Sequence, residues 1–116
     1  TRGGLATTLN EFVIGQNCGI TVNEDRIPVR KAIRGLCEPL GFSPLYLANE
    51  GKLVVIVKND QAEEALAIMQ ENTLGERASI IGKVTETNKG RVTIRTTIGS
   101  QRILDMKSGE MLPRIC

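Results

Sequence analysis

The sequence ends in a cysteine, and this residue is the most distinctive group that could do chemistry. The last four residues are Pro113, Arg114, Ile115 and Cys116. A cysteine at this position resists burial because its α-carboxylate must stay solvated. The carboxylate also disfavours the thiolate, and Arg114 offsets this effect only in part, so the resting thiol is not strongly activated. Two interpretations stay open: a free thiol without a function, or a carrier thiol that a partner charges.

Two further stretches could contribute chemistry, and each has a structural interpretation as well. Residues 1–4 (Thr-Arg-Gly-Gly) precede a predicted helix, whose first backbone N–H groups could face a phosphate. A pair of glycines before a helix is also typical of a simple turn. Residues 49–52 (Asn-Glu-Gly-Lys) precede an apolar run. Glu50 could accept a proton at a sheet edge, with Gly51 admitting a ligand close to the backbone, or the stretch is a surface turn.

The composition excludes several classes of function. The chain has no histidine, which removes Ser-His-Asp and Cys-His catalysis and histidine metal sites from it. Three cysteines cannot all pair internally, their spacing matches no common zinc site, and we expect Cys18 and Cys37 to be structural. A formal charge of +2 with one Tyr, two Phe and no Trp argues against nucleic-acid binding. No apolar run approaches the roughly 20 residues that span a bilayer, and no signal peptide is visible, so we expect a cytoplasmic protein without a membrane partner.

Apolar periodicity predicts three helices. Helical spacing of apolar residues covers residues 4–15, 28–40 and 61–71. Gly15 and Gly41 are the expected ends of the first two helices. Asp60 and Glu63 have the spacing of a capping box at the start of the third.

Strand patterns fill most of the remaining chain. We expect a short strand over 18–23, and a strand buried on both faces over 52–58, where five apolar residues follow one another. Residues 79–87 and 91–98 flank Asn88, Lys89 and Gly90, which predicts a β-hairpin. Gly99 and Ser100 allow a further turn into a strand over 101–104.

This order of elements predicts a two-layer α+β domain over residues 1–104. Helices would cover one face of a mixed or largely antiparallel sheet. Residues 105–116 lack apolar periodicity, so we expect a flexible tail, whose extended length is at most roughly 36–40 Å. The chain begins at Thr1 without a methionine, and we expect it to be a fragment of a longer protein.

Taken in order, these segments resemble the C-terminal domain of the HypE family of hydrogenase maturation proteins. This family belongs to the superfamily of aminoimidazole ribonucleotide synthetase and selenophosphate synthetase. The resemblance covers the whole chain and is carried by residues 1–5, 48–54, 81–84 and 113–116. The first is similar to the end of the family's Asp-x-Thr-Arg-Gly-Gly segment, and the last is similar to its closing Pro-Arg-Ile-Cys signature.

The resemblance implies an ATP-dependent carbamoyl dehydratase. A carbamoyl group on the Cys116 sulfur would be phosphorylated on oxygen by ATP and would lose phosphate to give a thiocyanate, the source of the cyanide ligands of [NiFe]-hydrogenase. Cys116 and Glu50 would be catalytic, as carrier and base. Thr1, Gly3 and Gly4 would line the phosphate side of an ATP and Mg²⁺ site, which lies mostly in an N-terminal domain that this chain lacks. The resemblance gives the chain no metal ligand of its own.

The resemblance also implies partners for the intact protein. It would be a homodimer, receive its carbamoyl group from the carbamoyltransferase HypF, and pass cyanide to the HypC–HypD complex. The 116-residue chain alone would be inactive. Two alternatives stay open: a related ATP-dependent synthetase in which Cys116 is incidental, and a non-catalytic module that only docks partners.

Overall fold

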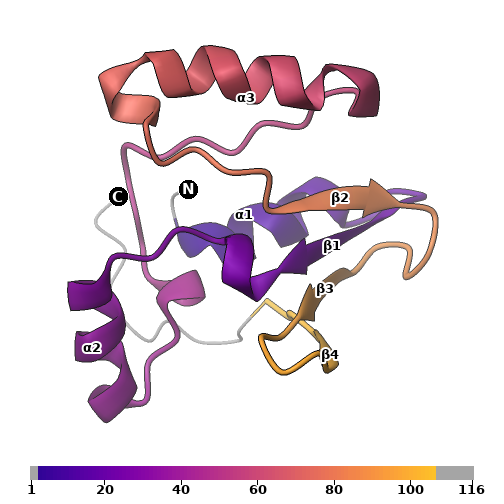
Figure 1. Cartoon of the computed structure of the whole chain (residues 1–116). Helices are drawn as coiled ribbons and strands as arrows, with labels where there is room; N and C mark the ends of the chain where they lie inside the picture. Colours follow the sequence, from indigo (N-terminus) through magenta and orange to yellow (C-terminus); the bar gives the residue numbers. More distant parts are fainter. Residues whose placement is uncertain (1–2, 107–116) are drawn as a thin grey trace.

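Three helices and four strands are found in residues 3–106, the part of the chain that the computed structural model describes (Figure 1). In chain order they are α1 (Gly4–Val13), β1 (Gly19–Asn23), α2 (Lys31–Leu40), α3 (Ala62–Glu71), β2 (Gly82–Thr85), β3 (Val92–Arg95) and β4 (Gln101–Ile103). Thr1 and Cys116 lie outside the described residues, as does all of the predicted tail beyond Met106.

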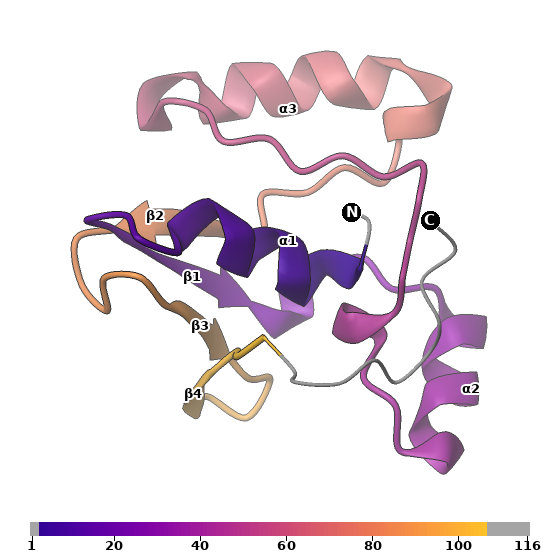
Figure 2. The same ribbon diagram turned by 180° about the vertical axis from the view of Figure 1, so that it is seen from behind.

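The strands form one mixed sheet in the order β2-β1-β3-β4. β1 pairs antiparallel with β2 and parallel with β3, and β3 pairs antiparallel with β4. α1 lies across one face of this sheet (Figure 2). The predicted α+β class with a mixed sheet is therefore confirmed.

The core lies between α1 and the two central strands, and it is aliphatic. Its buried residues come from α1, β1, β3 and three connections: Ala6, Leu9, Val13, Ile20, Val22, Ile27, Leu45, Val92, Ile94 and Leu104. Burying one such Val, Leu or Ile side chain contributes about 1.5–3 kcal/mol. This cluster therefore holds α1 against the sheet and sets the position of everything attached to it.

The predicted hairpin around residues 88–90 is wrong, because β1 lies between β2 and β3. The turn itself forms: Asn88 and Gly90 have positive φ angles of 50° and 75°, and the Arg91 N–H donates to the Asn88 carbonyl at 3.0 Å. The chain then crosses the start of β1, where a Cβ on Gly19 would meet the backbone oxygens of Thr87 and Asn88. The glycine at this position leaves room for the crossing, so each flanking strand pairs with β1.

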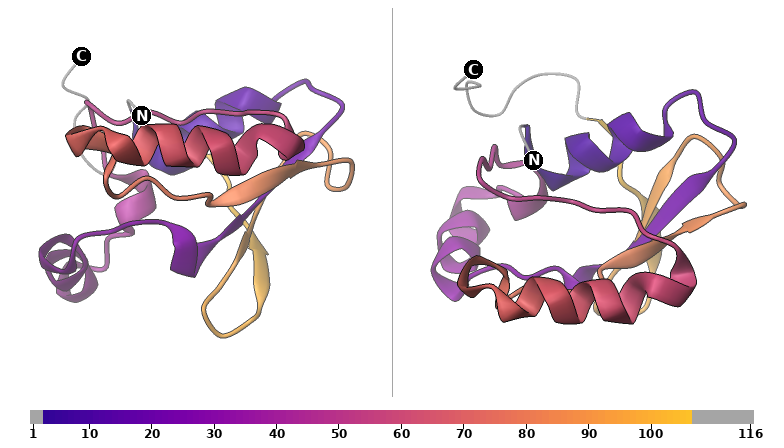
Figure 3. Two further views of the ribbon diagram at one scale, coloured as in Figure 1. Left: turned by 45° about the horizontal axis from the view of Figure 1, so that its top comes forward. Right: turned by 90° about the horizontal axis from the view of Figure 1, so that it is seen from above.

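The predicted strand over 52–58 is also wrong. This segment is extended but belongs to no sheet, and it runs alongside α3 (Figure 3). Four of its five apolar residues are exposed, with Leu53 at 76% and Ile56 at 52%, whereas Val54 packs partly against the core. An apolar run indicates a tendency to be buried, but a strand also needs a backbone partner. Within residues 3–106, none of the sheet's four strands pairs with it.

The helices agree with their predicted positions more closely than with their predicted ends. α1 ends just before Gly15, which has a φ of 72°, and α2 ends at Gly41, with a φ of 69°. Pro28 precedes α2 rather than lying in its first turn, because the helix begins at Lys31. The predicted capping box of α3 is wrong, since its N-cap is Gln61 and no side chain caps it.

Candidate functional site

The start of α1 lies directly against a distant turn of the chain. Gly4 is buried and has a φ of 89°, and a Cβ on it would lie 2.7 Å from the Leu45 oxygen and 2.9 Å from the Leu47 oxygen. Gly3, the N-cap, has a φ of 82°. L-residues with side chains rarely adopt this left-handed conformation, so the two glycines let the chain enter α1 at close range to residues 45–47. The structural interpretation of the glycine pair is thus supported.

The same turn holds the beginning of the C-terminal segment. Tyr46 lies in the 3-10 turn Pro44–Tyr46, and its hydroxyl donates a 2.7 Å hydrogen bond to the Asp105 carbonyl oxygen. Burial raises the pKa of Tyr46 above its ordinary value of 10.0, an effect that Arg102 opposes and Asp105 reinforces. The hydroxyl therefore stays protonated, and able to donate, throughout the neutral range.

A second contact fixes the residue before Asp105. Leu104 is fully buried, and its N–H donates to the Val92 carbonyl at 2.8 Å. Its carbonyl accepts a 2.7 Å hydrogen bond from Asn10 Nδ2, which also donates to the Ala6 carbonyl at 2.8 Å. The chain leaving β4 is thus attached to α1, to β3 and to the Tyr46 turn.

Glu50 lies four residues after Tyr46, in the loop that leads to the exposed 52–58 segment. Its side chain is exposed, and Gly51 beside it has a φ of 77° with open space around its Cβ position. The structure thus brings three stretches together: the Gly3–Gly4 turn, the turn that leads to Glu50, and the root of the C-terminal tail at Asp105. Of the predicted site residues, Thr1 and Cys116 lie outside the described residues.

Sequence reasoning missed Tyr46 and Asn10, which make the contacts to the tail root. A signal for Asn10 was present: it lies four residues after Ala6 and three before Val13, so it is a polar residue on the buried stripe of α1. Such a residue needs a hydrogen-bond partner. Tyr46 carries no comparable signal, because it lies outside every predicted helix and strand. Its partner, 59 residues away, is known only from the structure. The expectation that Cys37 is structural agrees with its burial.

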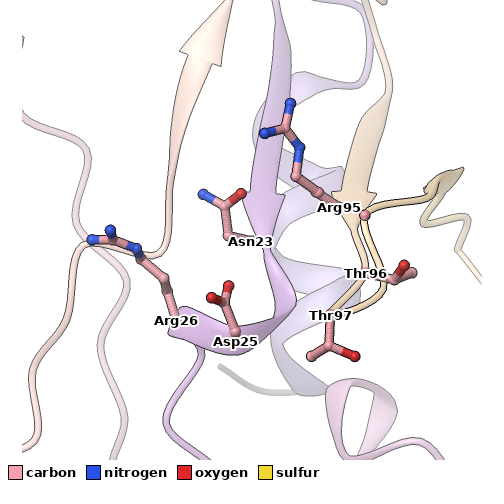
Figure 4. A pocket seen from close by; sticks show the side chains of 7 residues that line it. Asn23, Asp25, Arg26, Arg95, Thr96 and Thr97 are labelled. Carbon is pink, nitrogen blue, oxygen red and sulfur yellow. The ribbon is translucent and has the colours of Figure 1, made fainter.

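A separate polar hollow lies where β1 and β3 end (Figure 4). It has a volume of about 430 Å³ and is lined by Asn23, Asp25, Arg26, Arg95, Thr96, Thr97 and Gly99. Arg26 and Arg95 lie on opposite sides of Asn23 and Asp25. The hollow contains none of the predicted site residues. Among residues 3–106 there is no group of three or more His, Cys, Asp or Glu that could hold a metal ion.

None of the helices in the described part of the chain has the length and apolar character needed to cross a membrane.

Known proteins similar to this chain include hydrogenase maturation factors. The chain is 48% identical over 116 residues to the carbamoyl dehydratase HypE of Rhodobacter capsulatus, with 100% of this chain and 34% of that protein covered. It is equally similar, at 48% over 116 residues, to the carbamoyl dehydratase HypE of Cupriavidus necator, of which it covers 33%. The chain thus spans about a third of the length of these curated relatives.

Solved structures of HypE share the fold. One crystal structure of the hydrogenase maturation protein HypE matches with a TM-score of 0.91 and 47% identity, over 100% of this chain and 38% of that one. A HypE in complex with ATP matches with a TM-score of 0.89 and 44% identity, over 100% and 36%. A HypE–HypF complex matches with a TM-score of 0.85 and 43% identity, over 92% and 34%.

The family model described as "AIR synthase related protein, C-terminal domain" matches residues 1–95. This match and the HypE relatives confirm the resemblance that the sequence motifs indicate. The chain therefore belongs to the family of AIR synthase related proteins, as their C-terminal domain.

Proposed function

We propose that this chain is the C-terminal part of a carbamoyl dehydratase that makes the cyanide precursor for [NiFe]-hydrogenase. The observation that carries the proposal is similarity along all 116 residues, through Cys116, to proteins named carbamoyl dehydratase HypE. In this proposal residues 1–104 form the folded domain, and residues 105–116 are the tail that carries the reacting sulfur.

The proposed reaction converts a thiocarbamate on Cys116 into a thiocyanate. The Cys116 Sγ bears a carbamoyl group, whose oxygen leaves as phosphate while both N–H protons are removed, so that S–C(=O)–NH₂ becomes S–C≡N. ATP, when bound, supplies the phosphoryl group that makes this oxygen a good leaving group. Tethering the reacting carbon to the protein makes the encounter intramolecular, which is worth up to roughly 7–11 kcal/mol of the barrier.

Glu50 is the proposed base for the N–H protons. It lies on an exposed loop close in sequence to Tyr46, which contacts the tail root, and Gly51 beside it has no side chain to obstruct a ligand. A carboxylate suits this role because the carbamoyl nitrogen becomes more acidic once its oxygen carries phosphate.

Thr1, Gly3 and Gly4 are the proposed contribution of this chain to the phosphate side of the nucleotide site. The start of α1 fits a phosphate group: its N-cap is a glycine without a capping side chain, and its first turn has no acidic residue. The match to a HypE in complex with ATP supports nucleotide binding by the intact protein. In this proposal a Mg²⁺ ion is held chiefly by the rest of the full-length protein.

The relatives support one of the proposed partners, HypF. The match to a HypE–HypF complex supports HypF as the donor of the carbamoyl group. We further propose that the HypC–HypD complex accepts the cyanide, that the intact protein is a homodimer, and that it works in the cytoplasm, where thiols stay reduced.

The test is replacement of Cys116 in the full-length protein, with cyanide incorporation into hydrogenase as the measurement. We expect Cys116→Ala and Cys116→Ser to abolish incorporation while leaving ATP binding unchanged. Full product formation by Cys116→Ala would contradict the proposal and favour a related synthetase. Retention of every downstream step by Cys116→Ser would instead favour a docking module.

A further inference from the structure

Tyr46 occupies a turn that contacts both the start of α1 and the root of the C-terminal tail. Its neighbours Leu45 and Leu47 lie against Gly4, and its hydroxyl donates to the Asp105 carbonyl oxygen at 2.7 Å. The Glu50 loop begins directly after this turn. One phenol hydroxyl thus connects the segment that carries Glu50 with the segment that leads to Cys116.

The neighbouring contacts make the tail root a defined point. Leu104 is fixed by burial, by its hydrogen bond to Val92 and by the one it accepts from Asn10. These contacts hold Leu104 but leave the direction of the following residues open. The Tyr46 hydrogen bond acts one residue further on, at the Asp105 carbonyl, and so extends the held part of the chain to Asp105.

We infer that Tyr46 is a positioning residue for the dehydration step, because it holds the root of the carrier tail beside the turn that leads to the Glu50 loop. The inference rests on the proposed function. A tethered group reacts at a rate that depends on where its tether is rooted as well as on tether length. From Asp105 to Cys116 the tail is eleven residue steps long, at most roughly 36–40 Å when extended, so many directions compete with the productive one.

The two half-reactions separate this role from a merely structural one. Loading of Cys116 takes place on a second protein, so it depends on the reach of the tail and not on its direction relative to Glu50. Dehydration requires the loaded sulfur to return to this domain. Loss of the Tyr46 hydroxyl should therefore slow the second step and leave the first unchanged.

The experiment compares full-length Tyr46→Phe with the wild-type protein in both half-reactions, followed by intact mass over time. We expect carbamoylation at the wild-type rate, unchanged KM for ATP, and single-turnover dehydration that is slower by about 2- to 12-fold, the factor equivalent to one net hydrogen bond. Gln70→Met is the matched control, because it removes another hydrogen bond from a side chain to a backbone carbonyl, that of Ala78, at 3.0 Å. It should change neither step.

The outcomes distinguish this inference from the proposed function. If wild-type Cys116 is never carbamoylated, the proposed function fails. If it is loaded and Tyr46→Phe dehydrates at the wild-type rate, or if the variant slows both steps alike, the positioning role is wrong.

Hydrogen exchange provides a second measurement, which needs no active enzyme. In the full-length wild-type protein, the Leu104 amide, which donates to the Val92 carbonyl, should exchange more slowly than in an unstructured peptide. Tyr46→Phe should speed this exchange, because it releases the carbonyl of the next residue, Asp105. Exchange in the wild-type at the unstructured rate would show that the root is not held, and would overturn the inference even if the variant failed to fold.

Discussion

Two regions of the described chain, an inner one and an outer one, differ in how far their apolar side chains are buried. In the inner region, formed by α1, β1, β3 and Leu104, apolar residues are buried against one another. In the outer region, residues 53–74, none is fully buried and several are exposed: Leu53 and Ile56 in the extended segment, Ile68 on α3 and Leu74 after it. Apolar residues are frequent in both regions. Burial therefore depends on which surfaces the fold brings together, and the inner region is the one that can position a site.

The largest expected effect comes from removing volume in the inner region. Ile94→Ala should lower the free energy of unfolding by about 2–5 kcal/mol, because Ile94 is fully buried in the central strand β3 and its loss leaves a cavity. Ile56→Ala, the same substitution in the outer region, should cost about 1 kcal/mol or less, since that side chain is already half exposed. Urea unfolding measures both. Equal losses would remove the distinction between the two regions.

The next effect concerns two glycines of positive φ, Gly4 at the start of α1 and Gly15 shortly after its end. Gly4→Ala should cost about 3 kcal/mol or more, because the new methyl group would add a collision with the backbone of residues 45–47 to the strain of a left-handed conformation. Gly15→Ala has the strain but open space around it, and should cost about 1–2 kcal/mol. Thermal unfolding compares the pair. If Gly4→Ala were the milder change, the close approach to the Tyr46 turn would be wrong.

Asn10→Ala should cost about 1–3 kcal/mol, because it leaves the buried Leu104 carbonyl without the hydrogen bond from Asn10. Thr8→Ala is the control. It removes a hydroxyl that donates to the Gly4 carbonyl one helical turn back, a carbonyl close to the helix's own N–H donors, so its cost should be about 0.5–1 kcal/mol. Chemical denaturation with hydrogen exchange at Leu104 is the measurement. A cost for Asn10→Ala no greater than for Thr8→Ala would contradict the tail anchor.

The smallest expected effect is that of Tyr46 ionisation on the stability of the folded chain at high pH. The raised pKa of Tyr46 means that the unfolded chain loses this proton at lower pH than the folded one, so the contribution to stability is complete below pH 10.0 and is lost as the pH rises further. Because Tyr46 is the chain's one tyrosine, phenolate absorbance follows it directly. The midpoint should lie above 10.0 in the folded chain and return to the ordinary value in urea. A folded midpoint at or below the ordinary value would contradict the partial burial of this side chain.

The sequence predicted local elements well and long-range contacts poorly. α1, β1, α3 and the turn at Gly99 follow from apolar spacing and glycine, which act over a few residues. The hairpin failed because the turn at Asn88 is compatible with two topologies, and the absence of a side chain on Gly19 selects the one in which β1 intervenes. No pattern within a few residues could reveal this choice.

In the candidate site too, short motifs could be recognised from the sequence, whereas long-range contacts could not. The glycine pair and Glu50 could be chosen from short motifs, and residue chemistry alone made Cys116 conspicuous. The hydrogen bonds that Tyr46 and Asn10 make to residues 105 and 104 join positions 59 and 94 residues apart. Such contacts depend on the packed core, so the connection between the tail root and the Tyr46 turn emerges only from the structure.

The central claim is that Cys116 carries the reacting carbon, and intact mass of the full-length protein tests it most directly. With HypF, a carbamoyl donor and ATP, the account predicts that Cys116 gains one carbamoyl group and then loses one water equivalent, with the second change dependent on ATP. A Cys116 sulfur that stays unmodified with every reactant present, or a carbamoyl group that is found on another residue, would contradict it.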